Sequence, residues 1–471
     1  MRERTGEVDS RRDPLRNQGS RTRSRQRKWP LRCRPIHRMS IATLLAWVVL
    51  ASAPGTAAET QSPPQPTGQA DGEAGPPEAT DPTQQHRWHM PRRGARKLAP
   101  AAVGPVHAEW NRLGHLVNAG KSELRDWGIT FDVDLTFFDQ QASRVESGRK
   151  NFGTFSWRNM GDAKLFDLRD SDHLSGLGRG SISWNTFGTA GLNYDPSEET
   201  LSGNLGSIST LNATVFDHAA IVDELFWKQV SCGGKLLVLG GKIDMLYHFD
   251  TNRVANDAYS QFFSYALQNN PSIPGPLYGG FGGIVRANLP RSAYLMFGVG
   301  DSSMDRAVAP WKTLDNHSWY QLLELGLSPS VPVLGKGNYR ITPWHNHLFG
   351  EDGYGIGLSL DQELGRKDLV AFFRFGYGDE DVTPVETFVA GGIGLEAPFG
   401  REDDLAAIGV AWSDPSPGSG DRDETLVELL YRVGLAKGIS ITPDLQLVFD
   451  PADGADHDFV VVPGIRLHLV F

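Results

Sequence analysis

The clearest pattern along this chain is an alternation of apolar and polar residues with a period of two. Across residues 129–137 every odd position is apolar and every even position is Thr or Asp. The same alternation returns at 369–377 and at 439–449. Successive side chains of a β-strand point to opposite faces, so these segments are predicted to be strands with one apolar face.

The alternation predicts sixteen strands in all. Their expected ranges are 129–138, 161–168, 178–187, 222–230, 235–245, 282–289, 292–300, 320–328, 337–345, 353–362, 367–377, 386–396, 403–412, 424–433, 439–448 and 460–471. The connections after odd-numbered strands are mostly longer than those after even-numbered strands. An even strand count with long loops on one rim is the layout of an outer-membrane barrel. The predicted fold class is all-β, a transmembrane antiparallel β-barrel of about 16 strands with a short N-terminal helix.

The end of the chain favours the same fold. Positions 465, 467, 469 and 471 are all apolar, and the last of them is the aromatic Phe471. A terminal aromatic residue on an amphipathic strand is what the outer-membrane assembly machinery commonly recognises. We therefore expect that machinery to be a partner and deletion of Phe471 to reduce assembly.

The first residues have the pattern of an export signal. Residues 1–38 carry 13 Lys and Arg and 4 Asp and Glu, and a short apolar segment, 41–50, follows them. Small residues then lead to Ala58. A basic region, a short apolar core and a small-residue site predict a secretory signal over 1–58, with the mature chain starting near Glu59. Met39 remains an alternative start.

Two further segments precede the strands. Residues 59–104 are rich in Pro, Gln, Thr and Gly and are predicted to be a disordered leader. Residues 105–128 show apolar residues at spacings of three and four and are predicted to form an amphipathic periplasmic helix. The barrel is assigned to 129–471.

Composition excludes several classes of protein. A hydrophobic fraction of 39% and a mean hydropathy of -0.33 exclude a polytopic helical membrane protein. The formal net charge is -10, and without the basic residues 1–38 it is -19, which excludes a nucleic-acid partner. Of the two cysteines only Cys232 remains after signal removal, so no internal disulfide can form.

Several stretches resemble the carbohydrate-selective porin (OprB-type) family of Gram-negative outer membranes. They are 127–131, 222–229, 239–244, Gly337-Asn-Tyr-Arg340, 424–432, 441–446 and Gly464-Ile-Arg466. The resemblance spans roughly 107–471 in order. It implies a sixteen-stranded barrel with a preceding periplasmic helix that passes mono- or oligosaccharides by facilitated diffusion.

Motifs that would indicate catalysis or metal binding are weak. His345-Asn-His347 has no obvious third metal ligand in the sequence, so a solvated pair is the better interpretation. The four aspartates of 450–458 lack the spacing of an EF-hand, although a divalent cation in this loop stays open. Neither Gly-x-Ser-x-Gly nor His-Glu-x-x-His is present. We predict no enzyme activity, no cofactor and no dedicated metal site.

Polar residues on the inner faces of the strands are the candidate solute contacts. Mixed charges would offer donors and acceptors to sugar hydroxyls, and aromatic rings would stack on a pyranose. The expected pore-lining set is Glu224, Lys228, Lys242, Asp244, Arg286, Trp184 and Tyr278. Any one of these charges could equally pair with another across a wet lumen, and Trp184 could belong to an outer aromatic girdle.

The opposite faces are expected to contact lipid. The residues predicted there are Leu237, Leu239, Ile243, Leu445 and Leu447. The connection 246–281 is the longest and is unusually rich in aromatic residues, so it is predicted to fold into the barrel and narrow it. Packing against other loops or against a neighbouring subunit is the alternative.

The resulting functional prediction is an outer-membrane porin of a Gram-negative bacterium. Its partners would be carbohydrate solutes, outer-membrane lipid and lipopolysaccharide, and a trimer or a monomer remains open. A channel for other solutes is the first alternative, and a secreted all-β sugar-binding protein is the second. Neither the sugar nor the conductance follows from the sequence.

Overall fold

The computed structural model describes residues 120–471 except 172, 277, 304–312, 349–350 and 454–456. The chain divides into two units, Met1–Pro76 and Pro77–Phe471, and every described residue belongs to the second. The predicted signal, leader and first part of the helix lie outside the described residues. Within the described part, no helix is long and apolar enough to cross a membrane.

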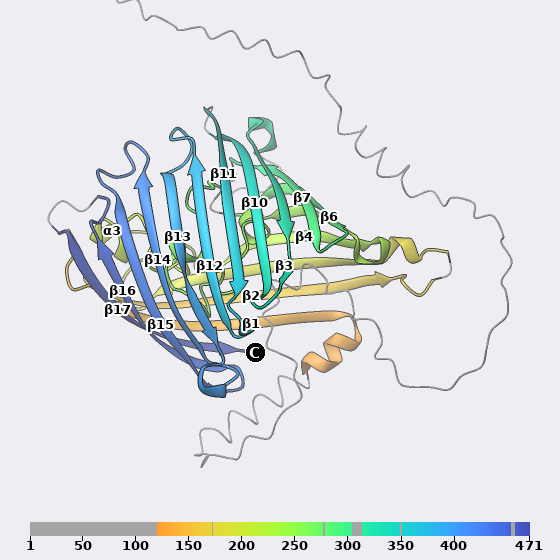
Figure 1. The fold of residues 1–471 in the computed structure, drawn as a ribbon, viewed down its shortest axis with the longest axis horizontal. Coiled ribbons are helices and arrows are strands. Elements are labelled where there is room, and N and C mark those ends of the chain that lie inside the picture. The colour runs from red at the N-terminus through yellow and green to blue at the C-terminus, as the bar shows by residue number, and fades with distance from the viewer. Residues whose placement is uncertain (1–119, 172, 277, 304–312, 349–350, 454–456) are drawn as a thin grey trace, which may run out of the picture. The chain divides into compact units, whose positions relative to one another are not determined.

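The described residues form one closed antiparallel β-barrel (Figure 1). Its strands are β1 (Ile129–Gln141), β2 (Asn151–Asp167), β3 (Arg179–Gly191), β4 (Ile221–Ser231), β5 (Leu236–Ile243), β6 (Gly280–Leu289), β7 (Ala293–Asp301), β8 (Trp319–Leu327), β9 (Ser330–Val331), β10 (Gly335–Leu348), β11 (Glu351–Glu363), β12 (Leu369–Gly378), β13 (Val385–Glu396), β14 (Leu405–Pro415), β15 (Glu424–Ala436), β16 (Ile439–Phe449) and β17 (Phe459–Val470). Neighbours in sequence pair with each other, and β1 closes the barrel against β17. The two-residue β9 lies in the turn before β10, so the wall has sixteen strands, as predicted.

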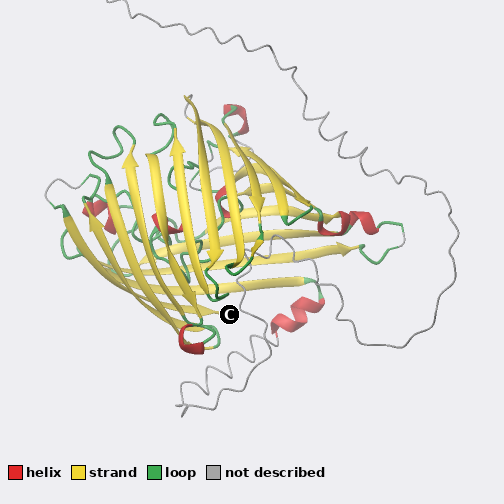
Figure 2. Ribbon diagram, viewed as in Figure 1, coloured by secondary structure: helices red, strands yellow, loops and turns green. Residues whose placement is uncertain are grey.

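Loop lengths differ between the two rims. The three long connections, 192–220, 244–279 and 302–318, all follow barrel strands that run toward the same rim. Turns such as 232–235 and 437–438 occupy the other rim. Figure 2 shows loops and short helical segments behind the strands of the wall and also at both ends of the strands. By the layout of outer-membrane barrels, the long-loop rim is extracellular and the short-turn rim is periplasmic.

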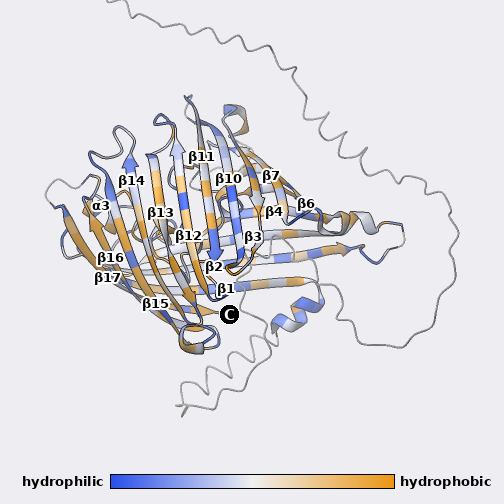
Figure 3. Ribbon diagram, in the orientation of Figure 1, coloured by the Kyte–Doolittle hydropathy of each residue, from blue (hydrophilic) through white to orange (hydrophobic). Residues whose placement is uncertain are grey.

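Alternation along the strands separates an apolar outer face from a buried inner face. On β8, Tyr320 and Glu324 are fully buried, whereas Leu323 and Leu325 are exposed. Figure 3 shows hydrophobic residues recurring along the strands from β12 to β17. Exposed Leu, Ile, Val and Phe side chains on the outer face are suited to lipid, because apolar surface there meets hydrocarbon rather than water.

Loop segments pack against the inner face of the wall. One apolar cluster joins Met245 and Phe249 to inner residues of β5–β8, including Leu239 and Tyr320. A second cluster joins residues 254–267 to inner residues of β12–β17. The interior is therefore largely filled by folded-in loop rather than lined by polar side chains alone.

The structure corrects two strand assignments. β2 starts at Asn151, ten positions before the predicted 161. The prediction missed this part of the strand because Phe152, which points inward and packs on Tyr194, is apolar and so interrupts the alternation.

On β5, Leu237, Leu239 and Ile243 are buried on the inner face, so the prediction that they contact lipid is wrong. They pack against the apolar loop that fills this side of the barrel. Leu445 and Leu447 do lie on the outer face, because they alternate with buried Asp444, Gln446 and Val448.

The two ends of the barrel domain lie close together. Residues 120–126 are helical, and Lys121 Nζ donates to the carbonyl oxygen of Phe471. The Phe471 backbone also pairs with Val133 of β1 in both directions. The terminal aromatic residue thus extends the seam that closes the barrel.

Candidate functional site: the loop inside the barrel

The long connection 244–279 turns into the barrel directly after β5. Its first residue, Asp244, accepts a hydrogen bond from the Leu246 amide at 2.9 Å and so caps the short turn Met245–Tyr247. Beyond it, the rings of Phe249, Phe262 and Phe263 are almost fully buried. Burial of so many rings stabilises the inward path of the loop. The predicted inward folding of this loop is therefore seen in the structure.

Arginines on the wall hold the loop backbone. Arg374 on β12 is fully buried, lies 2.8 Å from Asp250 Oδ2 and donates to the carbonyl oxygens of Ala255 and Leu267 at 2.7 and 3.0 Å. Arg466 on β17 donates to the carbonyl oxygens of Ala258 and Gln261. Each guanidinium presents several fixed donors, so a single side chain satisfies several buried carbonyls.

Wall carboxylates bind the loop amides in the same way. Glu428 on β15 accepts from the backbone amides of Phe263 and Ser264. Glu324 on β8 accepts from the Asp250 amide at 2.8 Å. A carboxylate that accepts backbone N–H groups removes the cost of burying them unpaired.

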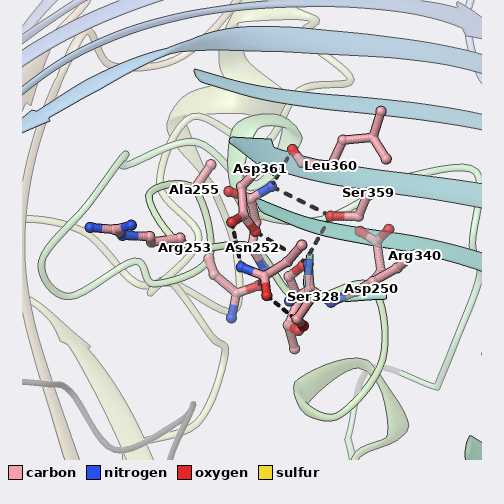
Figure 4. A network of polar contacts seen from close by, with 12 residues as sticks. Asp250, Asn252, Arg253, Ala255, Ser328, Arg340, Ser359, Leu360 and Asp361 are labelled. Carbon is pink, nitrogen blue, oxygen red and sulfur yellow. Dashed lines mark hydrogen bonds and ion pairs between the residues drawn. The ribbon is translucent and has the colours of Figure 1, made fainter. Parts of the chain in front are cut away.

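Figure 4 shows the loop meeting β10 and β11. Asn252 donates to the carbonyl oxygen of Leu360 at 3.1 Å, and Ser359 Oγ donates to the carbonyl oxygen of Thr251 at 2.9 Å. Beside them, Arg340 pairs with Asp361 at 3.3 Å. The loop is thus bonded to the wall by both backbone and side-chain groups.

The loop extends to the periplasmic ends of the strands. Arg253 lies 2.9 Å from Glu363, the last residue of β11, and 2.7 Å from Glu396, the last residue of β13. Arg432, four residues before the end of β15, donates to the carbonyl oxygen of Ser260. The loop therefore follows the inner wall from one rim to the other.

A second loop, 192–220, also folds inward, which the sequence reasoning missed. Glu424 accepts from Ser207 Oγ and from the amides of Ile208 and Ser209. Gln140 and Gln446 both donate to the carbonyl oxygen of Leu211. This second loop lies against the first, because the Tyr265 amide donates to the carbonyl oxygen of Thr210.

Glu224 and Lys228 lie on the inner face of β4, as predicted. Glu224 Oε1 lies 2.9 Å from His248 Nε2 of the loop. Lys228 Nζ lies 3.4 Å from Asp162 Oδ2, and Ser181 and Ser183 donate to the same carboxylate. Glu224 thus contacts the start of the loop, whereas Lys228 and Asp162 pair along the wall, on the two strands that flank β3.

Lys242 and Trp184 lie on the outer face, so their assignment to the lumen is wrong. Lys242 is directly opposite exposed Leu225 and Phe281, and its ammonium donates to the carbonyl oxygen of Val222. Its place at the extracellular end of β5 lets a charge stay out of the hydrocarbon. Trp184 packs over Gly161, where any larger side chain would collide with the ring, and donates to Asn159 Oδ1.

The other three predicted residues, Asp244, Tyr278 and Arg286, make contacts with other groups of the protein. Asp244 caps the first turn of the loop, and its amide lies 3.3 Å from Glu224 Oε1. Tyr278 is buried among other rings and donates to Asp217 Oδ1 at 2.9 Å. Arg286 is inward but stacks 3.7 Å from the centre of the Tyr294 ring, near the periplasmic end of β6. The structure brings Glu224 and Asp244 together, whereas Arg286 lies apart from them.

An adjacent carboxylate escaped prediction. Asn185 pairs with Glu224 and Thr186 pairs with Val222, so Asp223 is an extra, bulged residue of β4. Asp223 and Glu224 are consequently both buried on the inner face, although strict alternation would place one of them outside.

Four inner arginines were not among the predicted pore-lining residues, although the alternation had already placed one of them, Arg374, on the polar face. Arg158, Arg340, Arg374 and Arg466 each occupy an inner position of a strand whose flanking residues are largely apolar and face outward. Strand parity alone would have found them. The loop carbonyls and carboxylates that they bind are not visible from strand parity.

Burial also alters the acidity of loop carboxyl groups. It raises the pKa of Asp250 to about 6, although the Arg374 guanidinium acts in the opposite direction. Burial, and then repulsion from the carboxylates of Asp223 and Glu224, raise the pKa of Asp244.

His345 and His347 lie on the outer face and share Asp352. Their ring nitrogens are 3.2 and 2.8 Å from the same oxygen, Asp352 Oδ1. Among the described residues, no group of three or more His, Cys, Asp or Glu side chains is arranged to hold a metal ion.

Known proteins share both sequence and fold with this chain. Residues 345–471 match the family model described as carbohydrate-selective porin, OprB family. Porin AaxA of Chlamydia abortus is 27% identical over 235 residues, which are 47% of this chain and 51% of that protein. Porin AaxA of Chlamydia felis is 25% identical over 309 residues, 61% of this chain and 68% of that protein. The chain thus spans about half the length of the first curated relative and two thirds of the length of the second.

The fold has a solved counterpart. The high-pH structure of Pseudomonas putida OprB superposes with a TM-score of 0.62 at 17% sequence identity, covering 75% of this chain and 97% of that chain. At 17% sequence identity, the similarity between the two structures shows a shared fold and no more. The comparisons place the protein among outer-membrane β-barrels of Gram-negative bacteria, as the sequence predicted. The predicted resemblance to the carbohydrate-selective porin (OprB-type) family is therefore confirmed by the family model over residues 345–471, and the predicted barrel fold by the solved structure.

Proposed function

We propose that this protein is an outer-membrane channel through which carbohydrates diffuse, and that the loop 244–279 sets what passes. The observation that carries the proposal is the position of this loop, bonded along the inner wall from β5 to β17. A barrel narrowed by an internal loop passes small solutes more slowly than an open one and can discriminate among them. The description of the matching family supports carbohydrates as the solutes.

Sugar passage requires polar groups along the part of the barrel interior that the loop does not fill. Glu224, Lys228 and Asp162 supply charged acceptors and donors on the inner face of β2–β4. These groups can exchange hydrogen bonds with sugar hydroxyls in place of water. The protein needs no catalytic group for this activity, and we propose none.

Swelling of liposomes that contain the purified protein tests the proposal. We expect faster swelling with mono- and oligosaccharides than with amino acids of similar size. Equal rates for both solute classes would favour a channel of broader selectivity, and absence of swelling would contradict a channel altogether.

A further inference from the structure

Basic groups on the inner face near the loop are mostly engaged with particular partners. Arg158 lies between Asp134, at 3.0 Å, and Asp257, at 2.8 Å. Lys228 lies beside Asp162, and the ammonium of Lys242 is bound on the outer side. In these hydrogen bonds and ion pairs the cations bind acceptors outside the group of carboxylates described next, although the charge of Lys242 still acts on Asp223 and Asp244.

Three carboxylates gather where the loop leaves β5. We call Asp223, Glu224 and Asp244 the acidic cluster. The bulge of β4 turns its first two members inward, and the Asp244 amide donates toward Glu224. Among the described residues, His248 is the only basic side chain at ion-pair distance from the cluster, through Glu224.

Two acceptors here have no hydrogen-bond donor from the described protein. Asp223 is fully buried; its Oδ1 accepts from the Gly279 amide at 2.9 Å, whereas its Oδ2 has no partner. Asn185, directly opposite Glu224 on β3, has an unpartnered Oδ1. A buried acceptor without a donor is unfavourable, so this place is suited to a group that brings N–H or O–H donors.

We propose that the acidic cluster selects solutes by charge, so that solutes with a net positive charge, such as amino sugars without a carboxylate, pass more readily than neutral ones and anionic solutes pass least. The inference rests on the proposed channel function and assigns it a solute preference. An ammonium group supplies several donors and a positive charge to three carboxylates whose one ion-pair partner among the described residues is His248. An anion would be repelled by the negative charge of the carboxylates.

Two substitutions remove charge and keep the local hydrogen bonds. Asp223→Asn retains the Oδ1 acceptor for the Gly279 amide, and Glu224→Gln retains an acceptor for His248. Asn185→Asp does the opposite, because it adds a carboxylate facing Glu224. Asp352→Asn, on the exposed outer face, is the matched control.

The experiment measures reversal potentials in planar bilayers under a potassium chloride gradient at neutral pH. We expect the wild-type protein to prefer potassium over chloride. Asp223→Asn and Glu224→Gln should each lower the permeability ratio by about fivefold, the factor for about 1 kcal/mol, which is one charge pair across about 4 Å of water. Asn185→Asp should raise the ratio, and Asp352→Asn should leave it unchanged.

Liposome swelling with one sugar skeleton completes the test. The wild-type protein should pass 6-amino-6-deoxyglucose fastest, glucose more slowly and glucuronate slowest. Conducting Asp223→Asn and Glu224→Gln channels with the wild-type ratio and solute order would overturn the charge selection and leave the channel function intact. A wild-type protein that passes neither ions nor sugars would overturn both. If both variants fail to assemble, the Asn185→Asp shift and the wild-type solute order decide the question.

Discussion

At the scale of single residues, arginine is the side chain that fixes the loop inside the barrel. Arg374 is fully buried and binds Asp250 as well as two loop carbonyls. Removing one partner of a buried charge pair leaves the other uncompensated, which costs far more than losing a surface pair. The loop is therefore expected to depend strongly on a few guanidinium groups.

Arg374→Ala should destabilise the barrel by roughly 3–5 kcal/mol, because it leaves Asp250 and the two carbonyls unpaired. The temperature at which the extracted protein loses its heat-modifiable mobility on a gel measures the effect. Arg366→Ala is the control, since the exposed Arg366–Asp368 pair should contribute no more than about 1 kcal/mol. An equal loss of stability in the Arg374→Ala and Arg366→Ala variants would contradict the role given to Arg374.

Lipid contact is a second property of individual residues. Leu445 is exposed on the outer face of β16, so Leu445→Arg should cost about 2–4 kcal/mol if it lies near the middle of the membrane. Leu435, exposed near the end of β15, should tolerate Arg at about 0–1 kcal/mol because it lies closer to the interface. Folding titrations in lipid vesicles give both values. Full stability of Leu445→Arg would show that the register of β16 is wrong.

At the scale of elements, the strands could be predicted because one face must be apolar for lipid. That requirement repeats on every wall strand, so alternation located all sixteen of them. It failed where the inner face is apolar too. Leu236-Leu-Val-Leu239 is apolar on both faces because its inward side chains pack on the loop, so parity could not tell inside from outside.

The prediction of the candidate site residues depended on the same alternation of inward and outward positions. Glu224 and Lys228 were placed correctly because the neighbouring Leu225 and Trp227 are outward and apolar. Asp223 was missed because a bulge breaks the period by one residue. The partners of the inner arginines are carbonyls and carboxylates of distant loop segments, which no local pattern reveals.

The β5 register gives a test at this scale. In a Cys232→Ser background, a small fluorophore on Val238→Cys should be quenched by a lipid-borne quencher, because Val238 faces outward. The same label on Leu239→Cys should be shielded, because Leu239 is buried inside. Quenching of the Leu239→Cys label and not of the Val238→Cys label would show that β5 has the orientation predicted from the sequence, with Leu239 facing lipid.

At the scale of the whole molecule, the barrel is closed by its first and last strands. The pairing of β1 with β17 runs from Asp134 opposite Val470 to Gln140 opposite Gly464, and Phe471 extends it to Val133. The buried pair of His468 and Asp134 crosses the same seam at 2.8 Å. Closure removes the free strand edges that a barrel cannot leave in lipid.

Deletion of Phe471 should lower the amount of assembled barrel, because it removes two backbone hydrogen bonds at the seam and the aromatic end of the chain. Heat-modifiable protein in outer-membrane fractions measures assembly. Phe471→Tyr keeps an aromatic ring and the backbone pairing, so it should assemble normally. Wild-type assembly of the deleted chain would argue against this role.

The central claim is that the loop 244–279 sets both the conductance and the solute preference of the channel. Replacing residues 251–271 by a short Gly-Ser linker tests it most directly, with a matched deletion inside 59–104 as the control. Single-channel conductance in planar bilayers and swelling with sugars and amino acids are measured on variants that retain heat-modifiable mobility. We expect conductance to rise severalfold and the preference for sugars to disappear, whereas the control keeps both. Unchanged conductance and an unchanged preference in the shortened variant would contradict the account.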